Sequence, residues 1–286
     1  MTIRGPTNLM RYCTVQIEIL EPESNRGFGT GFFFNWPTEN EWSCPLLVTN
    51  KHVVANATVG RVRVHTSTLK DGVRIPSGAS HGIEIHFFSE QWINHPEENV
   101  DLCAMPFGVV LHELRLDGVE VFANYLQREM IPTGKTLDEL QAVEDILMVG
   151  YPRGLIDNTN NFPLIRKGIT ASHPAVDFEG KPEGVIDIAC FPGSSGSPVF
   201  VINPGSYAAA DDRPFWPNDR ILFLGVLHAG PVLHATGEIA VANIPINVPK
   251  NFALNLMIHL GYYVKSRELI ALAKEVVDQH KKLSAS

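Results

Sequence analysis

The chain has 286 residues, of which 44% are hydrophobic and 19% charged, a balance typical of globular proteins with a sizeable core. Its formal charge of -8 comes without a basic stripe, which argues against nucleic acid as a partner. No apolar run approaches the roughly 18 residues of a membrane span, and the N-terminal segment lacks the apolar core of a secretory signal, so we expect a cytoplasmic protein without a membrane partner.

Short apolar runs rich in β-branched and aromatic residues dominate the chain, separated by Gly, Pro, Asn and Asp clusters. They predict strands over 12–20, 29–34, 46–49, 59–65, 83–88, 102–107, 146–150, 165–171, 185–189, 198–202, 221–227 and 239–242. Because helices do not alternate with these strands, the pattern favours an all-β fold of barrels or sandwiches.

Two segments depart from the strand pattern. Thr136 and Glu139 have the spacing of a capping box, which predicts a short helix over 136–144. Apolar residues recur at near-helical spacing from Ser266 to Leu283, which predicts an amphipathic helix docked on the body. A membrane-surface helix is the alternative, but the apolar stripe is narrow and lacks Trp and Phe.

The loop over 203–219 is rich in Gly, Pro, Asp and Ala and is long for a connection inside a barrel. We interpret it as an insertion, with a mobile flap as the alternative. The chain has four cysteines, and without a secretory signal reduced thiols are expected at Cys13, Cys44, Cys103 and Cys190. No clustered Cys/His spacing predicts a metal site, and no cofactor is expected.

A serine-bearing turn between two apolar runs is the strongest chemical signal. The segment 191–200 reads FPGSSGSPVF, with Gly-x-Ser-Gly-x-Pro around Ser195. Acyl transfer needs preorganised donors for an oxyanion, and glycines permit a tight turn that aims backbone N–H groups at one point. Gly193 and Ser195 are the natural donors. Taken alone, the segment is equally compatible with an ordinary Gly/Ser turn.

Two polar residues accompany apolar strands upstream. His52 follows the strand in LLVTNKHVV, and Asp101 opens the run in NVDLCAMPF. A lone His there is usually packed in a core, and a lone Asp usually ends a strand or forms a turn. Together with Ser195 they supply a base, an orienting carboxylate and a nucleophile, in that order along the chain.

With these motifs the chain resembles the trypsin/chymotrypsin-like serine peptidases. The Thr-x-x-His, Asp-Leu and Gly-x-Ser-Gly-x-Pro motifs stand in the family's order, and Gly29-Thr-Gly31 resembles its early Gly-x-Gly strand. The segment DIACFPG before the serine is most similar to the high-temperature-requirement branch and to bacterial stand-alone trypsin-like domains. The resemblance implies a serine endopeptidase with a His52, Asp101 and Ser195 triad that works through an acyl-enzyme.

The same resemblance implies two six-stranded antiparallel β-barrels packed around a cleft, followed by a C-terminal α-helix. His52 and Asp101 would come from the first barrel, and Ser195 with its oxyanion turn from the second. The expected division is a first barrel over 10–127, a linker with a short helix over 128–145, a second barrel over 146–262 and a C-terminal helix over 263–286.

The substrate pocket is expected at Ala189, six residues before the serine, and along the strand that contains His228, Ala229 and Gly230. Ala189 offers no counter-ion for Lys or Arg, so we expect cleavage after uncharged residues. His228 is a candidate hydrogen-bond donor for Glu or Gln, as in glutamyl-specific relatives. Its register is one residue later than in those relatives, which favours a structural role because adjacent strand residues face opposite sides.

Ser194 carries no charge that could pair with a newly cut N-terminus, so maturation by N-terminal cleavage is not predicted. Two alternatives stay open: a catalytically silent peptidase fold used as a binding module, and a protease effector activated by an unknown partner. An esterase of the α/β-hydrolase type is disfavoured because Gly-x-Ser-x-Gly is not matched. The expected partner is a polypeptide substrate of unknown identity.

Overall fold

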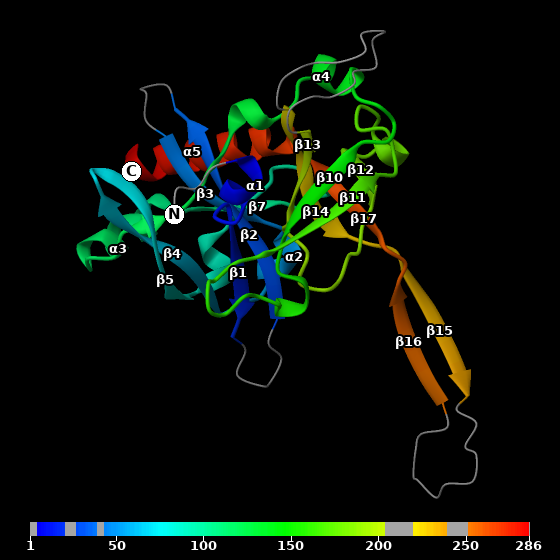
Figure 1. The fold of residues 1–286 in the computed structure, drawn as a ribbon, viewed down its shortest axis with the longest axis horizontal. Helices are drawn as coiled ribbons and strands as arrows, with labels where there is room; N and C mark the ends of the chain where they lie inside the picture. The colour runs from blue at the N-terminus through cyan, green and yellow to red at the C-terminus, as the bar shows by residue number, and fades with distance from the viewer. Residues whose placement is uncertain (1–4, 21–26, 39–42, 204–219, 239–250, 286) are drawn as a thin grey trace, which may run out of the picture.

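The computed structural model describes residues 5–20, 27–38, 43–203, 220–238 and 251–285. β-strands are its main regular structure, arranged as two large sheets and a separate hairpin, with a C-terminal helix (Figure 1). The predicted strand at 239–242 and nearly all of the predicted loop at 203–219 lie outside the described residues. No helix in the described ranges is long and apolar enough to cross a membrane.

The N-terminal half forms a nine-stranded sheet in the order β5-β4-β1-β2-β3-β7-β6, with β8 paired to β4 and β9 paired to β2. Its strands are β1 Thr14–Ile19, β2 Gly27–Pro37, β3 Ser43–Thr49, β4 Val59–Lys70, β5 Val73–His86, β6 Ile93–Asn94, β7 Cys103–Pro106, β8 Val121–Phe122 and β9 Leu126–Gln127.

This sheet differs from the six-stranded barrel expected for the first half. In the part of the chain that the structure describes, its end strands β5 and β6 do not pair with each other. The physical reason lies in strand length, because β4 and β5 form a hairpin of 12 and 14 residues whereas β6 has only two. So short a strand offers too few backbone groups to close the sheet.

The C-terminal half closes into a six-stranded antiparallel barrel in the order β10-β11-β12-β17-β14-β13. The barrel strands are β10 Asp145–Gly150, β11 Leu164–Thr170, β12 Glu183–Asp187, β13 Pro198–Asn203, β14 Arg220–Ala229 and β17 Leu260–Lys265. A separate hairpin of β15 Val232–Glu238 and β16 Asn251–Met257 extends away from the body (Figure 1).

The helices are short apart from the last one. They are α1 Pro6–Met10, α2 Lys51–Val54, α3 Gly108–Leu116, α4 Gly134–Asp138 and α5 Glu268–Ala285, with 3-10 turns η1 Phe88–Gln91, η2 Arg128–Met130, η3 Pro152–Gly154 and η4 Phe178–Gly180. The predicted C-terminal helix is confirmed as α5. The helix predicted over 136–144 is wrong in position, because Thr133 rather than Thr136 is the N-cap and accepts a hydrogen bond from the Thr136 N–H.

One apolar core joins the two sheets and α5. Phe32 and Phe34 of β2 meet Phe200 and Phe223 of the barrel, and Leu272 of α5 packs into the same cluster. Burying such aromatic side chains stabilises the fold by roughly 1.5–3 kcal/mol each. The core therefore fixes the two sheets against each other, and with them any site that is built from both.

Candidate active site

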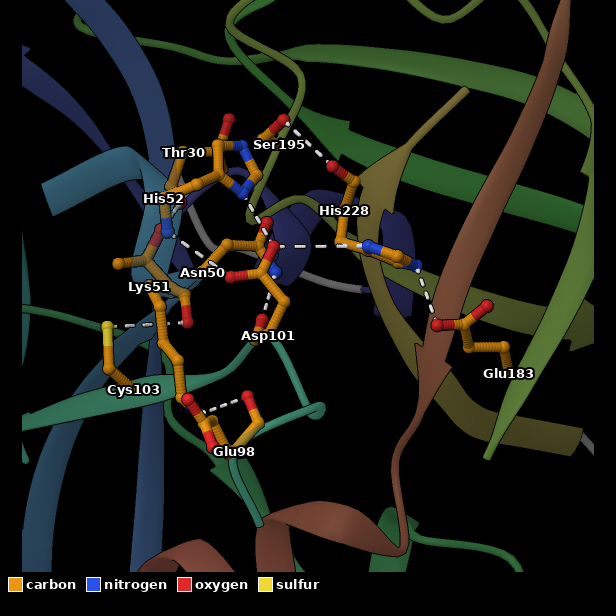
Figure 2. Close-up of polar contacts among 11 residues, drawn as sticks. Thr30, Asn50, Lys51, His52, Glu98, Asp101, Cys103, Glu183, Ser195 and His228 are labelled. Carbon is orange, nitrogen blue, oxygen red and sulfur yellow. Dashed lines mark hydrogen bonds and ion pairs between the residues drawn. The ribbon is translucent and has the colours of Figure 1, made fainter. Parts of the chain in front are cut away.

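His52 lies on a single helical turn directly after β3. Asn50 is extended and precedes α2, and Val54 anchors the turn in the core. Val53 packs over Gly29 of β2, where an added Cβ would lie 2.3 Å from the Val53 Cγ1. A side chain at Gly29 would therefore displace the turn. The imidazole of His52 remains 48% exposed and faces the space between the sheets (Figure 2).

Asp101 precedes β7, and β7 pairs with β3, so Asp101 and His52 lie side by side. The Asn50 side chain donates to the Asp101 backbone carbonyl at 2.7 Å. Asp101 Oδ1 accepts from the His52 backbone N–H at 3.2 Å, and Oδ2 accepts from His52 Nδ1 at 2.6 Å. A carboxylate only accepts, so Nδ1 carries the proton and Nε2 of the neutral ring is left as the base.

Burial acts to raise the pKa of Asp101, but hydrogen bonds and charge from His52 outweigh it and hold that pKa below its usual value. Asp101 is therefore ionised wherever the protein is folded at neutral pH. An ionised carboxylate at 2.6 Å holds the imidazole in this orientation and tautomer.

Ser195 lies on a turn that contacts both sheets. The Thr30 N–H donates to the Ser195 carbonyl at 2.9 Å, and the Thr30 hydroxyl donates to the Gly193 carbonyl at 3.2 Å. Gly193 and Gly196 have φ of 86° and 87°, and a Cβ on Gly196 would lie 1.8 Å from the Thr30 carbonyl oxygen. Both positions thus require glycine, as the sequence motif suggests.

The His52 ring lies between Asp101 and Ser195, with its second nitrogen on the serine side (Figure 2). The Ser195 hydroxyl donates to the His228 carbonyl at 3.4 Å rather than to His52. A serine hydroxyl reorients by rotation about χ1, and catalytic hydrogen bonds often form only with substrate present. The structure thus brings the three predicted residues into one place, with the serine in a resting orientation.

Two backbone amides of the turn, those of Gly193 and Ser195, point away from the hydrogen bonds that their preceding carbonyls accept. The carbonyl before Gly193 accepts from the Arg153 N–H at 2.6 Å, and the carbonyl before Ser195 accepts from the Ser197 N–H at 3.0 Å. In a trans peptide the N–H points opposite to the carbonyl. Within the described ranges the Gly193 and Ser195 N–H groups donate no hydrogen bond and are available to an external acceptor.

His228 sits at a β-bulge, between Leu227 and Ala229, where the β14–β17 register shifts. A bulge changes the direction of a side chain. The mostly buried His228 ring lies with Nδ1 at 3.9 Å from Asp101 Oδ2 and Nε2 at 3.4 Å from Glu183 Oε1 (Figure 2). Burial lowers the pKa of His228, while Glu183 and Asp101 act to raise it. The structure thus places His228 beside the Asp101 carboxylate.

The other predicted pocket residues lie at the barrel end beneath the serine turn. Ala189 is half-buried, and its carbonyl accepts a hydrogen bond from Arg166. Ala229, the last residue of β14, is exposed, and Gly230 directly after the strand is half-buried. Among the residues that the structure describes, no group of three or more His, Cys, Asp or Glu side chains is arranged to hold a metal ion.

A family profile described as the trypsin-like peptidase domain matches residues 29–205, which span both sheets and all three of the predicted triad residues. The chain belongs to this family. It is therefore a protease with a chymotrypsin-like fold, and the predicted resemblance is confirmed. No curated protein matches the sequence.

Several solved proteases are similar to this trypsin-like peptidase domain. The active form of the Rv3671c protease from M. tuberculosis is 13% identical, with a TM-score of 0.43 over 93% of this chain and 81% of that chain. Tobacco etch virus protease complexed with product is 12% identical, with a TM-score of 0.47 over 96% and 84%. Tobacco vein mottling virus protease is 14% identical, with a TM-score of 0.44 over 92% and 80%.

Sequence reasoning missed several residues that hold this peptidase site together. Thr30 could have been found, because it lies inside the Gly-x-Gly strand that the sequence singles out. Asn50 also offered a signal, as an amide that ends an apolar strand two residues before His52. Glu183 offered none, since only the barrel closure brings it to His228.

Proposed function

We propose that this protease is a serine endopeptidase in which His52, Asp101 and Ser195 act as a triad. The observation that supports it best is the 2.6 Å hydrogen bond from His52 Nδ1 to Asp101 Oδ2. It sets the tautomer in which Nε2, on the Ser195 side, is the unprotonated nitrogen. A packed core histidine would not have a half-exposed ring bonded to a half-buried carboxylate.

The reaction follows from these groups. Ser195 Oγ passes its proton to His52 Nε2 and forms a bond to the substrate carbonyl carbon. The Gly193 and Ser195 N–H groups stabilise the resulting oxyanion. His52 then gives the proton to the leaving amine as the C–N bond breaks, which leaves an acyl-enzyme. In the second half of the reaction, water gives a proton to His52 and attacks the acyl carbon. His52 returns the proton to Ser195 Oγ as the ester bond breaks, and the carboxylic acid product leaves.

The thiols support the choice of serine as nucleophile. A cysteine nucleophile needs a lowered pKa, usually beside a cation. Here burial raises the pKa of Cys13 to about 12 and that of Cys190 to about 11, and it also raises those of Cys44 and Cys103. All four are free thiols, and Ser195 is the residue on the glycine turn.

Cleavage after uncharged residues fits the surroundings of the predicted pocket. Ala189 supplies no counter-ion, and the Arg166 guanidinium bonded to its carbonyl adds positive charge nearby. A Lys or Arg side chain would then be buried unpaired, which costs several kcal/mol. The proposed pocket wall consists of His228, Ala229 and Gly230. The proposed substrate is a polypeptide, and the proposed reaction uses no cofactor and no nucleic acid.

Labelling with a fluorophosphonate probe tests the proposal. We expect adduct formation at Ser195 in the wild type, none in Ser195→Ala, and normal labelling in the neighbouring control Ser197→Ala. Failure of the pure wild type to label would favour a silent binding module. Labelling that appears only after addition of a cell extract would favour an effector that a partner activates.

A further inference from the structure

Arg166 enters the barrel from its open end. It lies on β11 opposite Met148 of β10, and the two side chains share a face because they are register partners. Met148 is fully buried in the barrel core, so the Arg166 stem runs along the inner surface of the barrel. Its guanidinium ends at the turn that carries the nucleophile.

Three points of that turn contact this one guanidinium. Arg166 Nη1 donates to the Ala189 carbonyl, and Nη2 donates to the Ser194 hydroxyl at 2.8 Å. The charge also lies 5.9 Å from the centre of the Phe191 ring. Ser194 is fully buried, and its Oγ also accepts from the Phe191 N–H at 3.4 Å. The two ends of the turn are thus connected through one planar group, which suits the fixed fork of arginine.

The placement of Arg166 is costly. Both hydrogen-bond partners are neutral, the Nε atom is buried without a partner, and burial lowers the pKa of the guanidinium. Arg166 is half-buried, and a partly buried cation without a carboxylate costs free energy that an apolar side chain at this position would not. Because Arg166 does not stabilise the fold, we expect it to serve the function of the protein.

Other contacts hold other parts of the turn. Cys190 is buried in the barrel core, and the Pro192 carbonyl accepts from the Arg153 N–H. Thr30 holds the turn from the first sheet through Gly193 and Ser195. The contribution of Arg166 is to join the Ala189 carbonyl to the Ser194 hydroxyl, directly before Ser195.

We propose that Arg166 is a positioning residue that keeps the 189–195 turn in the conformation whose N–H groups donate to the oxyanion, so that the uncut chain is active. The inference rests on the proposed serine peptidase function. The Arg166 cation, held inside the barrel, would take the place of the charged N-terminus that chain cleavage would otherwise have to create. Ser194, which is neutral, is then the matching acceptor.

The test compares Arg166→Met with Arg166→Lys and with the control Lys167→Ala. Lys167 is the next residue on β11, but it is exposed and pairs with Asp145 on the surface. In Arg166→Met we expect fluorophosphonate labelling and kcat to fall about 10- to 100-fold with KM nearly unchanged, short of the 10²–10³-fold loss of an oxyanion donor itself. Millimolar ethylguanidinium should restore part of the rate in Arg166→Ala, which leaves space for it, and none in Lys167→Ala, and Arg166→Lys should restore little.

The outcomes separate the two proposals. A wild type that does not label contradicts the serine peptidase itself. If the wild type is labelled and Arg166→Met is labelled equally fast, Arg166 has no positioning role. The same holds if Arg166→Met is labelled normally but changes its preference between Glu and Leu peptides. If Arg166→Met does not fold, Ser194→Ala decides, because it removes one acceptor without burying a charge. A several-fold lower kcat supports the proposal, and a wild-type kcat refutes it.

Discussion

Replacing Thr30 by Val tests whether the first sheet holds the serine turn. Thr30 is fully buried, and its hydroxyl donates to the Gly193 carbonyl at 3.2 Å. The same oxygen accepts from the Tyr151 N–H at 3.1 Å and from the Ser197 hydroxyl at 3.3 Å. Val keeps the shape of the side chain and removes all three hydrogen bonds.

The magnitude follows from what each partner loses. The buried Tyr151 N–H has no other acceptor in the described chain, and an unsatisfied buried donor costs about 1–3 kcal/mol. The Gly193 carbonyl loses a hydrogen bond worth about 1 kcal/mol, whereas the Ser197 hydroxyl can rotate. We expect Thr30→Val to lower the free energy of unfolding by about 3 kcal/mol, hence Tm by roughly 6–12 °C for a chain of this size.

Thermal unfolding and ester turnover of the same samples give the readout. Because the Gly193 peptide also loses a hydrogen bond, kcat should fall about tenfold at temperatures where Thr30→Val is still folded. This is a smaller loss of kcat than removal of an oxyanion donor causes. Thr30→Ser is the matched control, since it keeps the hydroxyl and should stay close to wild type in kcat. A Thr30→Val protein with wild-type Tm and kcat would show that the hydroxyl does not hold the turn.

Further predictions concern single residues. Asp101→Asn should keep the fold and lower kcat by about 10⁴-fold, because it removes the carboxylate that sets the His52 tautomer, and an active variant would exclude the proposed triad. The hydrogen bond from Arg267 lowers the pKa of Asp177 to about 2, so its stabilising effect is full above about pH 4 and is lost as pH falls towards 2. Asp177→Asn should therefore lower the free energy of unfolding measured in urea at pH 7, by on the order of 1 kcal/mol in this exposed pair, and match wild type near pH 2. Among matched peptides, Leu at the cleaved position should exceed Lys and Glu in kcat/KM, and a Glu preference that is lost in His228→Ala would make His228 the specificity residue.

Local signals in the sequence identified most strands and the last helix, but not every hairpin. Asp71 and Gly72 form the two-residue turn between β4 and β5, with φ of 51° and 75°. An Asp-Gly pair is a strong hairpin signal, yet Pro76 and Gly78 follow it and break the apparent strand pattern. A bulge between His65 and Ser67 absorbs that irregularity, so the hairpin continues.

The candidate site shows the same division between local and long-range information. His52, Asp101 and Ser195 were predictable because each lies in a short motif, and the structure places them together. The supports were not, because Thr30 meets Gly193 across 163 positions of the chain, and a single sequence carries no record of that contact. Arg166 looks like an ordinary strand residue until the barrel closes around it.

The contacts that Thr30 makes across the sheets have a consequence for denaturation experiments. Its N–H and hydroxyl reach Ser195 and Gly193 from a different sheet, so the reactive geometry exists only while the halves are docked. If the two halves separated, turnover would stop even if the strands within each sheet stayed paired. Enzymatic activity therefore reports whether the two halves are docked. As urea is raised, we expect activity to be lost before the circular dichroism signal of the strands.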